Sequence, residues 1–133
     1  MPPEDRVRLL HMVEALATAQ RFVVGRSRED LDADEMLRLA LTRAIEIVGE
    51  AAGRITLATQ EHYPDVPWRA LSGMRNRLIH AYFDVNRDIV WTTATQDVPR
   101  LLTRAETFST RIEREDGLPS EDGAVRQEKV QSV

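Results

Sequence analysis

Apolar residues recur along this chain at helical spacing and do not alternate as they would in a strand. The clearest series comprises Leu37, Leu41, Ala44, Val48, Ala51 and Ile55. Steps of three and four residues place side chains on one face of an α-helix, because one turn holds about 3.6 residues. The series therefore predicts a helix whose apolar stripe faces a core.

Four further segments have the same spacing, and none of the chain has the pattern of a strand or an internal repeat. The first helix is expected from about Glu4 to Val24, with Gly25 as a left-handed stop. Another is expected from about Trp68 to the region of His80–Phe83. The last two carry Ile89, Val90, Trp91 and Ala94, and then Leu101, Leu102, Ala105, Phe108 and Ile112 as far as about Glu115.

Capping and breaking residues separate these segments. Ser27–Asp30 and Asp32–Glu35 are overlapping capping boxes, which predict that a helix restarts there. Pro64 and Pro67 make residues 62–68 a connector, and Asp97 with Pro99 is expected to interrupt the last helical stretch.

The pattern as a whole predicts an all-α protein, an antiparallel bundle of four to five helices joined by short loops. The bundle domain is expected to span residues 1–116, and the polar, aperiodic residues 117–133 are expected to form a disordered tail. Within the long helix, Gly49, Ala52 and Gly53 form a face of small residues where another backbone can approach closely. Close packing is a simpler reading of this face than ligand contact.

Charge leaves the partner open. The net charge of −4 argues against a nucleic-acid ligand, but the acidic end of the chain accounts for most of it, so the body is close to neutral. All basic residues except Lys129 are arginine. Arginine-rich composition follows from a GC-rich coding sequence, and it also suits phosphate recognition by the planar guanidinium.

Several classes of site and location are disfavoured. The absence of cysteine excludes disulfides, thiolate nucleophiles and cysteine-bound metals. The three histidines, His11, His62 and His80, lie far apart without metal-binding spacing, so neither a metal nor another cofactor is expected. No segment is apolar enough to span a membrane, and the charged N-terminus is unlike a signal peptide, which predicts a cytoplasmic protein without membrane contact.

Candidate chemistry is concentrated in residues 67–83, PWRALSGMRNRLIHAYF. RNA cleavage without a metal needs proton transfer to and from ribose and leaving-group oxygens, and neutralisation of a pentacoordinate phosphorane. An imidazole such as His80 titrates near neutral pH, and a guanidinium such as Arg75 binds phosphate oxygens bidentately. Asn76 is suited to orient the phosphate or the imidazole. The plainer alternative is that His80 ends a helix, Tyr82 packs and the arginines are solvated.

Helical geometry adds a constraint. Arg75 and His80 are five positions apart and therefore point about 140° apart around an ideal helix. They can reach one phosphate only if the helix is distorted or if two subunits share the cleft. A homodimer about a two-fold axis satisfies the second condition.

The segment Arg75–Tyr82 resembles the R-x4-H-x-Y motif of HepT-like proteins of the HEPN superfamily. The blocks Ile47–Ala52, Val66–Trp68, Gly73–Asn76 and Ile89–Trp91 also look like family blocks in family order. The resemblance covers about residues 7–112.

This resemblance implies a homodimeric, metal-independent endoribonuclease toxin that leaves a 2′,3′-cyclic phosphate and a 5′-hydroxyl. It implies that Arg75 and His80 are catalytic and that Asn76 assists them, and Arg69 and Arg77 are expected to bind RNA. It also implies an antitoxin partner, an MNT-type nucleotidyltransferase that transfers AMP to Tyr82. An alternative is a non-catalytic helical module that docks such a nucleotidyltransferase.

Overall fold

A computed structural model describes residues 1–83 and 86–115, without the side chains of Arg77 and residues 79–83. The expected tail at 117–133 lies outside the described residues, and the extent of the domain stays a prediction. The described part of the chain is helical and has no strand. Its helices are α1 (Pro3–Val23), α2 (Arg28–Ala33), α3 (Glu35–Arg54), α4 (Leu57–His62), α5 (Trp68–Phe83), α6 (Arg87–Thr92), the π-helix η1 (Thr93–Asp97) and α7 (Val98–Glu115).

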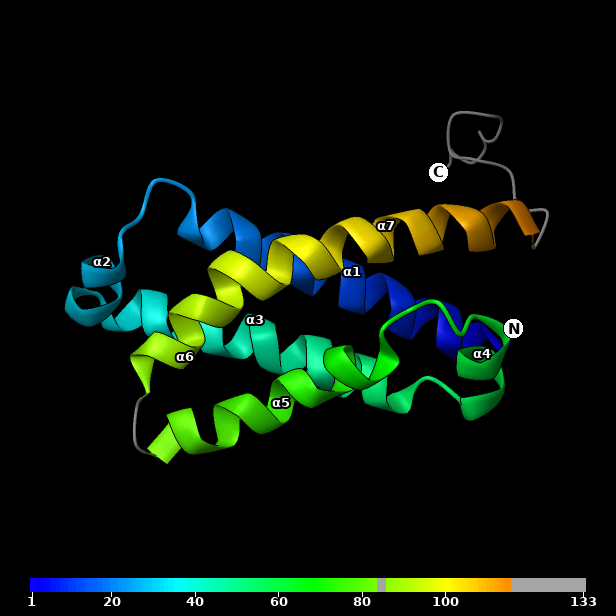
Figure 1. The fold of residues 1–133 in the computed structure, drawn as a ribbon, viewed down its shortest axis with the longest axis horizontal. Coiled ribbons are helices and arrows are strands. Elements are labelled where there is room, and N and C mark those ends of the chain that lie inside the picture. The colour runs from blue at the N-terminus through cyan, green and yellow to red at the C-terminus, as the bar shows by residue number, and fades with distance from the viewer. Residues whose placement is uncertain (84–85, 116–133) are drawn as a thin grey trace, which may run out of the picture.

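The long helices run side by side, and successive ones point in opposite directions, as the colours of Figure 1 show for α1, α3, α5 and α7. Helix α3 lies between α1 and α5 and packs against both, and α7 packs against α1. The short helices α2 and α4 lie at opposite ends of the molecule, and the short helix α6 leads through η1 into α7. None of the described helices combines the length and hydropathy that crossing a bilayer requires.

The apolar stripe expected on the second predicted helix is confirmed. All six of its residues are buried, from Leu41 and Val48 without exposed surface to Ala51 at 8%. They join a core that includes Met12 and Leu16 of α1 and Phe108 of α7. The fold is therefore set by the stripe of α3, since that helix has neighbours on two sides.

Capping explains where the early helices begin and end. Gly25 follows α1 with a φ of 74°, the left-handed conformation predicted for it. Ser27 and Asp30 form the predicted capping box at the start of α2. The second predicted box is wrong, because Asp34 and not Asp32 caps α3 by accepting a hydrogen bond from the N–H of Leu37 at 3.1 Å. The single helix predicted to begin in this region is thus two helices, α2 and α3. Helix α4 is a further short helix that the apolar periodicity did not predict.

The predicted interruption at Asp97 and Pro99 is also wrong. The chain stays helical from Arg87 to Glu115, and its turns widen to π-helix over Thr93–Asp97. Proline lacks an N–H, and its ring collides with the carbonyl four residues earlier in a regular α-helix. The wider turn, in which the N–H of Val98 bonds to the carbonyl of Thr93, accommodates the proline without breaking the helix.

A buried carboxylate joins the beginning of α1 to the beginning of α4. Asp5 is 1% exposed. It accepts hydrogen bonds from the N–H and hydroxyl of Thr56, at 3.1 and 2.6 Å, and from the hydroxyl of Thr59 at 2.6 Å. Burial raises the pKa of Asp5, but the bonds from Thr56 and Thr59 outweigh it, so the pKa lies below its ordinary value.

We expect Asp5→Asn to lower the free energy of unfolding by about 1–3 kcal/mol, because an NH2 donor replaces one of the two oxygens that accept hydrogen bonds from Thr56 and Thr59. The carboxylate's contribution is fully present above the unfolded pKa of about 3.9 and is lost as the pH falls through the lower folded pKa. Urea denaturation between about pH 5 and pH 3 should therefore show a smaller loss of stability in the variant than in the wild type. Parallel losses in the two proteins would contradict this role of Asp5.

Candidate active site on helix α5

The candidate site residues lie on α5, whose first turn is fixed by aromatic packing. Trp68 is buried, its indole N–H donates to the carbonyl of Tyr63 at 2.9 Å, and its ring meets Phe108 edge to face at 5.3 Å. Tyr63 in turn packs edge to face on Phe108 at 4.7 Å and bonds to Glu115 at 2.6 Å. The start of α5 is therefore held against the C-terminal half of α7.

The middle of α5 lies directly against α3 at a glycine. A Cβ placed on Gly49 would lie 2.8 Å from both the Cβ and the backbone nitrogen of Arg75. Such distances are shorter than van der Waals contact, and the atoms involved are not the flexible end of a side chain. Gly49 therefore allows the two helices to touch at the residue predicted to be catalytic.

The direction of the remaining side chains follows from this packing. Leu71, Met74 and Leu78 are almost fully buried and form the core-facing side of α5. Arg75 and Asn76 are exposed, as is Arg69 near the start of the helix. Three of the predicted site residues therefore lie on the solvent-facing side of α5.

The helix continues without interruption to Phe83, so His80 lies one turn beyond Asn76 and Tyr82 lies about two turns beyond Arg75. The side chains of Arg77, His80 and Tyr82 lie outside the described part. The predicted convergence of Arg75 and His80 on one phosphate therefore stays a prediction. Among the described residues, no three His, Asp or Glu side chains are grouped so that they could hold a metal ion.

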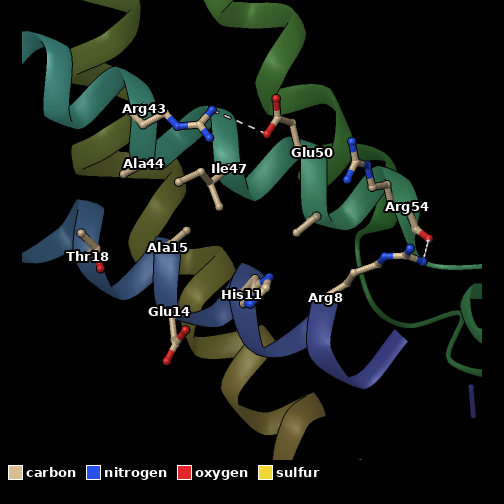
Figure 2. A pocket seen from close by; sticks show the side chains of 11 residues that line it. Arg8, His11, Glu14, Ala15, Thr18, Arg43, Ala44, Ile47, Glu50 and Arg54 are labelled. Carbon is tan, nitrogen blue, oxygen red and sulfur yellow. Dashed lines mark hydrogen bonds and ion pairs between the residues drawn. The ribbon is translucent and has the colours of Figure 1, made fainter. Parts of the chain in front are cut away.

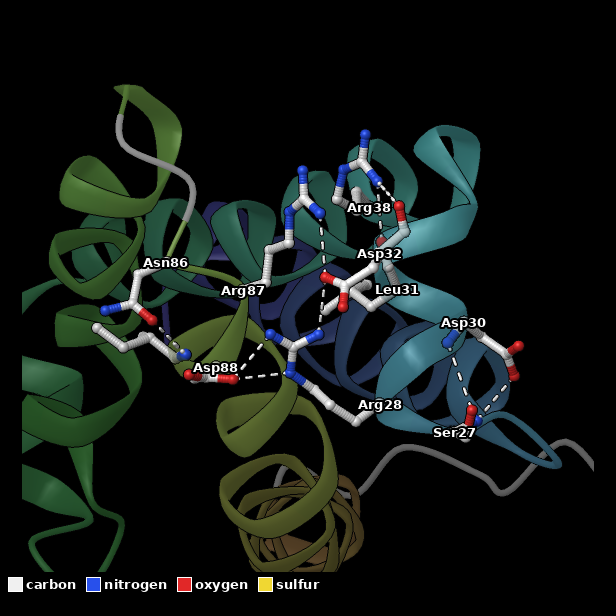
Figure 3. A network of polar contacts seen from close by, with 10 residues as sticks. Ser27, Arg28, Asp30, Leu31, Asp32, Arg38, Asn86, Arg87 and Asp88 are labelled. Carbon is white, nitrogen blue, oxygen red and sulfur yellow. Dashed lines mark hydrogen bonds and ion pairs between the residues drawn. The ribbon is translucent and has the colours of Figure 1, made fainter.

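An ion-pair network follows the far end of α5. In Figure 3, Asp32 of α2 lies between Arg28 and Arg87, at 2.9 and 3.0 Å, and Arg28 also pairs with Asp88 at 2.8 Å. Hydrogen bonds from Arg28 and Arg87 hold the pKa of Asp32 below its ordinary value. These contacts tie α6 to α2, and Asn86 caps α6 through the N–H of Ile89.

Some of the contacts that position α5 have a signal in the sequence. The small-residue face on α3 is confirmed at Gly49, but nothing lies within 4 Å of the Cβ position of Gly53. Of the network, only the pair of Arg28 and Asp32 had a signal in the sequence, because its spacing of four residues places both on one helix face. The contacts with α6 join residues more than fifty positions apart.

Comparison with known proteins places these features in a family. The family model described as "Ribonuclease HepT-like" matches residues 12–108. The "Probable ribonuclease HepT" of Thermococcus cleftensis is 36% identical over 95 residues, which cover 71% of this chain and 86% of that protein. The "Putative RNase MJ1216" of Methanocaldococcus jannaschii is 32% identical over 117 residues, which cover 87% of this chain and 97% of that protein. No solved structure matches the chain.

The contact at Gly49 predicts opposite effects of the same substitution at two glycines of α3. Alanine favours a helix over glycine by about 1 kcal/mol. At Gly49 the added methyl group meets the backbone of α5, and such overpacking costs about 1–3 kcal/mol. We therefore expect Gly49→Ala to lower the midpoint of urea denaturation.

Gly53→Ala is the matched control, because its methyl group would enter open space. This variant should be as stable as the wild type or more stable. If both substitutions raised the denaturation midpoint equally, the close approach of α3 and α5 at Arg75 would be refuted.

Proposed function

The chain belongs to the HepT-like ribonuclease family, and on that premise we propose that it is a metal-independent endoribonuclease whose site lies on α5. The observation that carries the proposal is the exposure of Arg75 and Asn76 on a helix that packs closely on α3 at Gly49. A guanidinium on a helix whose backbone is closely packed suits a phosphoryl transfer site, since catalysis depends on stabilising charge that develops in the transition state.

In the proposed reaction the ribose 2′-hydroxyl attacks the adjacent phosphorus and loses its proton. The bond from phosphorus to the 5′-oxygen breaks, and that oxygen gains a proton. The products are a 2′,3′-cyclic phosphate and a 5′-hydroxyl. Arg75 binds the non-bridging oxygens, His80 carries a proton transfer, and Asn76 orients the phosphate or the imidazole. Arg69 and Arg77 bind neighbouring phosphates of the RNA.

We propose that the active unit is a homodimer, because Arg75 and His80 point about 140° apart on a regular helix. Exposed apolar side chains support this assembly. Met36 and Leu39 at the start of α3 are 78% and 64% exposed. Figure 1 shows the start of α3 and the end of α5 at the same end of the molecule. A second copy packed there would cover apolar surface and bring two α5 helices together.

As regulation, we propose that the protein is a cytoplasmic toxin and that a nucleotidyltransferase antitoxin transfers AMP to Tyr82. The chain has two tyrosines. Tyr63 is 6% exposed and its hydroxyl is bonded to Glu115, so it is a poor acceptor. A phosphodiester on Tyr82 would place an anion about two turns from Arg75 and compete with the RNA phosphate.

The alternative function is a non-catalytic module that docks the nucleotidyltransferase. It shares the helical fold and the modified tyrosine with the first proposal. It differs in predicting no RNA cleavage, so a cleavage assay separates the two.

We expect the purified chain to cleave single-stranded RNA in the presence of EDTA. His80→Ala and Arg75→Ala should each lower kcat/KM by about 10²–10⁴-fold, because each removes a proton-transfer or charge-stabilising group. Arg75→Lys should also be poor, since an ammonium cannot reproduce the bidentate contact. Labelled RNA and mass spectrometry of the products measure both the rate and the cyclic phosphate.

His62→Ala is the control for a histidine outside α5, because His62 is exposed on α4. It should cleave at the wild-type rate. Equal cleavage by His80→Ala and wild type would refute the site, loss of cleavage in EDTA would refute metal independence, and products ending in a 3′-hydroxyl would refute the mechanism.

Tyr82 gives an independent prediction. Intact mass spectrometry of the chain co-expressed with an MNT-type nucleotidyltransferase should show one or more added AMP groups. The adduct should vanish in Tyr82→Phe and persist in Tyr63→Phe, because Tyr63 is buried. Wild-type chain that stays unmodified beside an active partner would contradict the proposal.

A further inference from the structure

A groove between α1 and α3 combines an apolar floor with a cationic rim. It has a volume of about 480 Å³. Ala15, Ala44, Ala51 and Ile47 form the apolar part. Figure 2 shows Arg8 on α1 reaching the carbonyl of Arg54 on α3, the carboxylate of Glu50 turned toward Arg43, and the carboxylate of Glu14 pointing away from α3. We call this feature the α1–α3 groove.

The arginines of the groove differ in how far their charges are neutralised. Arg43 pairs with Glu46 at 2.7 Å and with Glu50 at 3.6 Å. Arg8 donates to the backbone carbonyl of Arg54 at 2.8 Å. That bond uses one of its five N–H groups, and its nearest carboxylate is Asp5 at 3.9 Å.

Asp5 carries a negative charge that partly compensates Arg8, and its oxygens also accept three hydrogen bonds from Thr56 and Thr59. Within the described residues, no group pairs with the guanidinium of Arg54, which is exposed. One end of the groove therefore presents Arg54, which has no ion-pair partner among the described residues, beside Arg8, which keeps further N–H groups for an anion.

The groove also adjoins the candidate site. Gly49 touches α5 at Arg75, and Glu50, the next residue, lines the groove. Gly53 is exposed, with nothing within 4 Å of its Cβ position, and directly precedes Arg54. Gly53 therefore leaves α3 without a side chain directly before Arg54, and this gives room on the surface for an extended strand.

We propose that the α1–α3 groove binds a part of the RNA strand that lies beyond the scissile phosphate. This inference rests on the proposed ribonuclease function. Arg8 and Arg54 bind the phosphate backbone at one end of the groove, and the apolar floor beyond them receives the face of an unstacked base. Recognition of single-stranded RNA commonly combines a cationic path for the backbone with apolar or planar surfaces for splayed bases.

A second hollow offers a competing path between α5 and α7. It has a volume of about 210 Å³ and is lined by Met74, Arg100 and Arg104, among others. Arg100 is paired with Asp97 at 3.6 Å, and Arg104 donates to the carbonyl of Asp65 at 2.6 Å. This hollow is smaller, and both of its arginines have partners, whereas the α1–α3 groove has the unpaired guanidinium of Arg54 and therefore fits an RNA strand better.

The test uses the full chain carrying His80→Ala, so that the RNA stays intact, and a 5′-fluorescein single-stranded RNA as the probe. Fluorescence anisotropy at several salt concentrations gives the Kd and its salt dependence. Adding Arg54→Ala or Arg8→Ala should weaken binding about tenfold. Each should also lower the slope of log Kd against log salt by about one, as the loss of one phosphate contact requires.

Arg114→Ala is the matched control, because Arg114 is an exposed arginine near the end of α7 that does not line the groove. Arg54→Lys should keep the salt slope, since it keeps the charge. If Arg54→Ala and Arg8→Ala bind like the control, the proposal is wrong. It is equally wrong if Arg100→Ala alone weakens binding, or if Arg54→Ala instead dissociates a dimer in sedimentation, because the groove would then hold a second copy.

Cleavage assays with His80 intact separate this proposal from the proposed function. Arg54→Ala should raise KM and leave kcat unchanged. A chain that binds RNA through Arg54 but never cleaves it would support the groove and overturn the ribonuclease. A chain that cleaves RNA with an unchanged KM in Arg54→Ala would support the ribonuclease and overturn the groove.

Discussion

The contact between Gly49 and Arg75 is the constraint on which the site depends. Helices pack about 8–10 Å apart, depending on the side chains between them. Where α3 and α5 cross, α3 has a glycine without a side chain, and the backbone of α5 lies directly against it. A side chain on residue 49 would move the whole middle of α5. The position of the candidate catalytic arginine is therefore decided by a residue that belongs to another helix and has no functional group.

The ends of α5 are held by different physical means. Its first turn is held by buried aromatic contacts through Trp68, which are insensitive to salt. The chain after its last turn is tied to α2 by ion pairs of Arg28, Asp32 and Arg87, which are exposed enough to be screened. The two supports should respond differently to ionic strength, and the weaker one lies at the end of α5 that carries His80 and Tyr82.

Local patterns in the sequence were enough to predict the helices but not their relations in space. The stripe from Leu37 to Ile55 predicted α3 because burial on a helix leaves a periodic trace. Pro99 was misread as a break, because a π-turn that accommodates proline leaves no comparable trace. The motif identified Arg75, Asn76 and His80 by residue type and by resemblance. The α1–α3 groove had no signal, because it forms from residues about forty positions apart on two helices.

A site shared between two subunits is tested most directly by mixing inactive variants. Arg75→Ala and His80→Ala would be purified separately, combined, and allowed to exchange subunits before the cleavage rate is measured. Each mixed dimer then holds one intact Arg75 and one intact His80 on different chains. We expect the mixture to regain RNA cleavage that neither variant has alone. A mixture that contains mixed dimers and remains as inactive as its components would contradict a shared site.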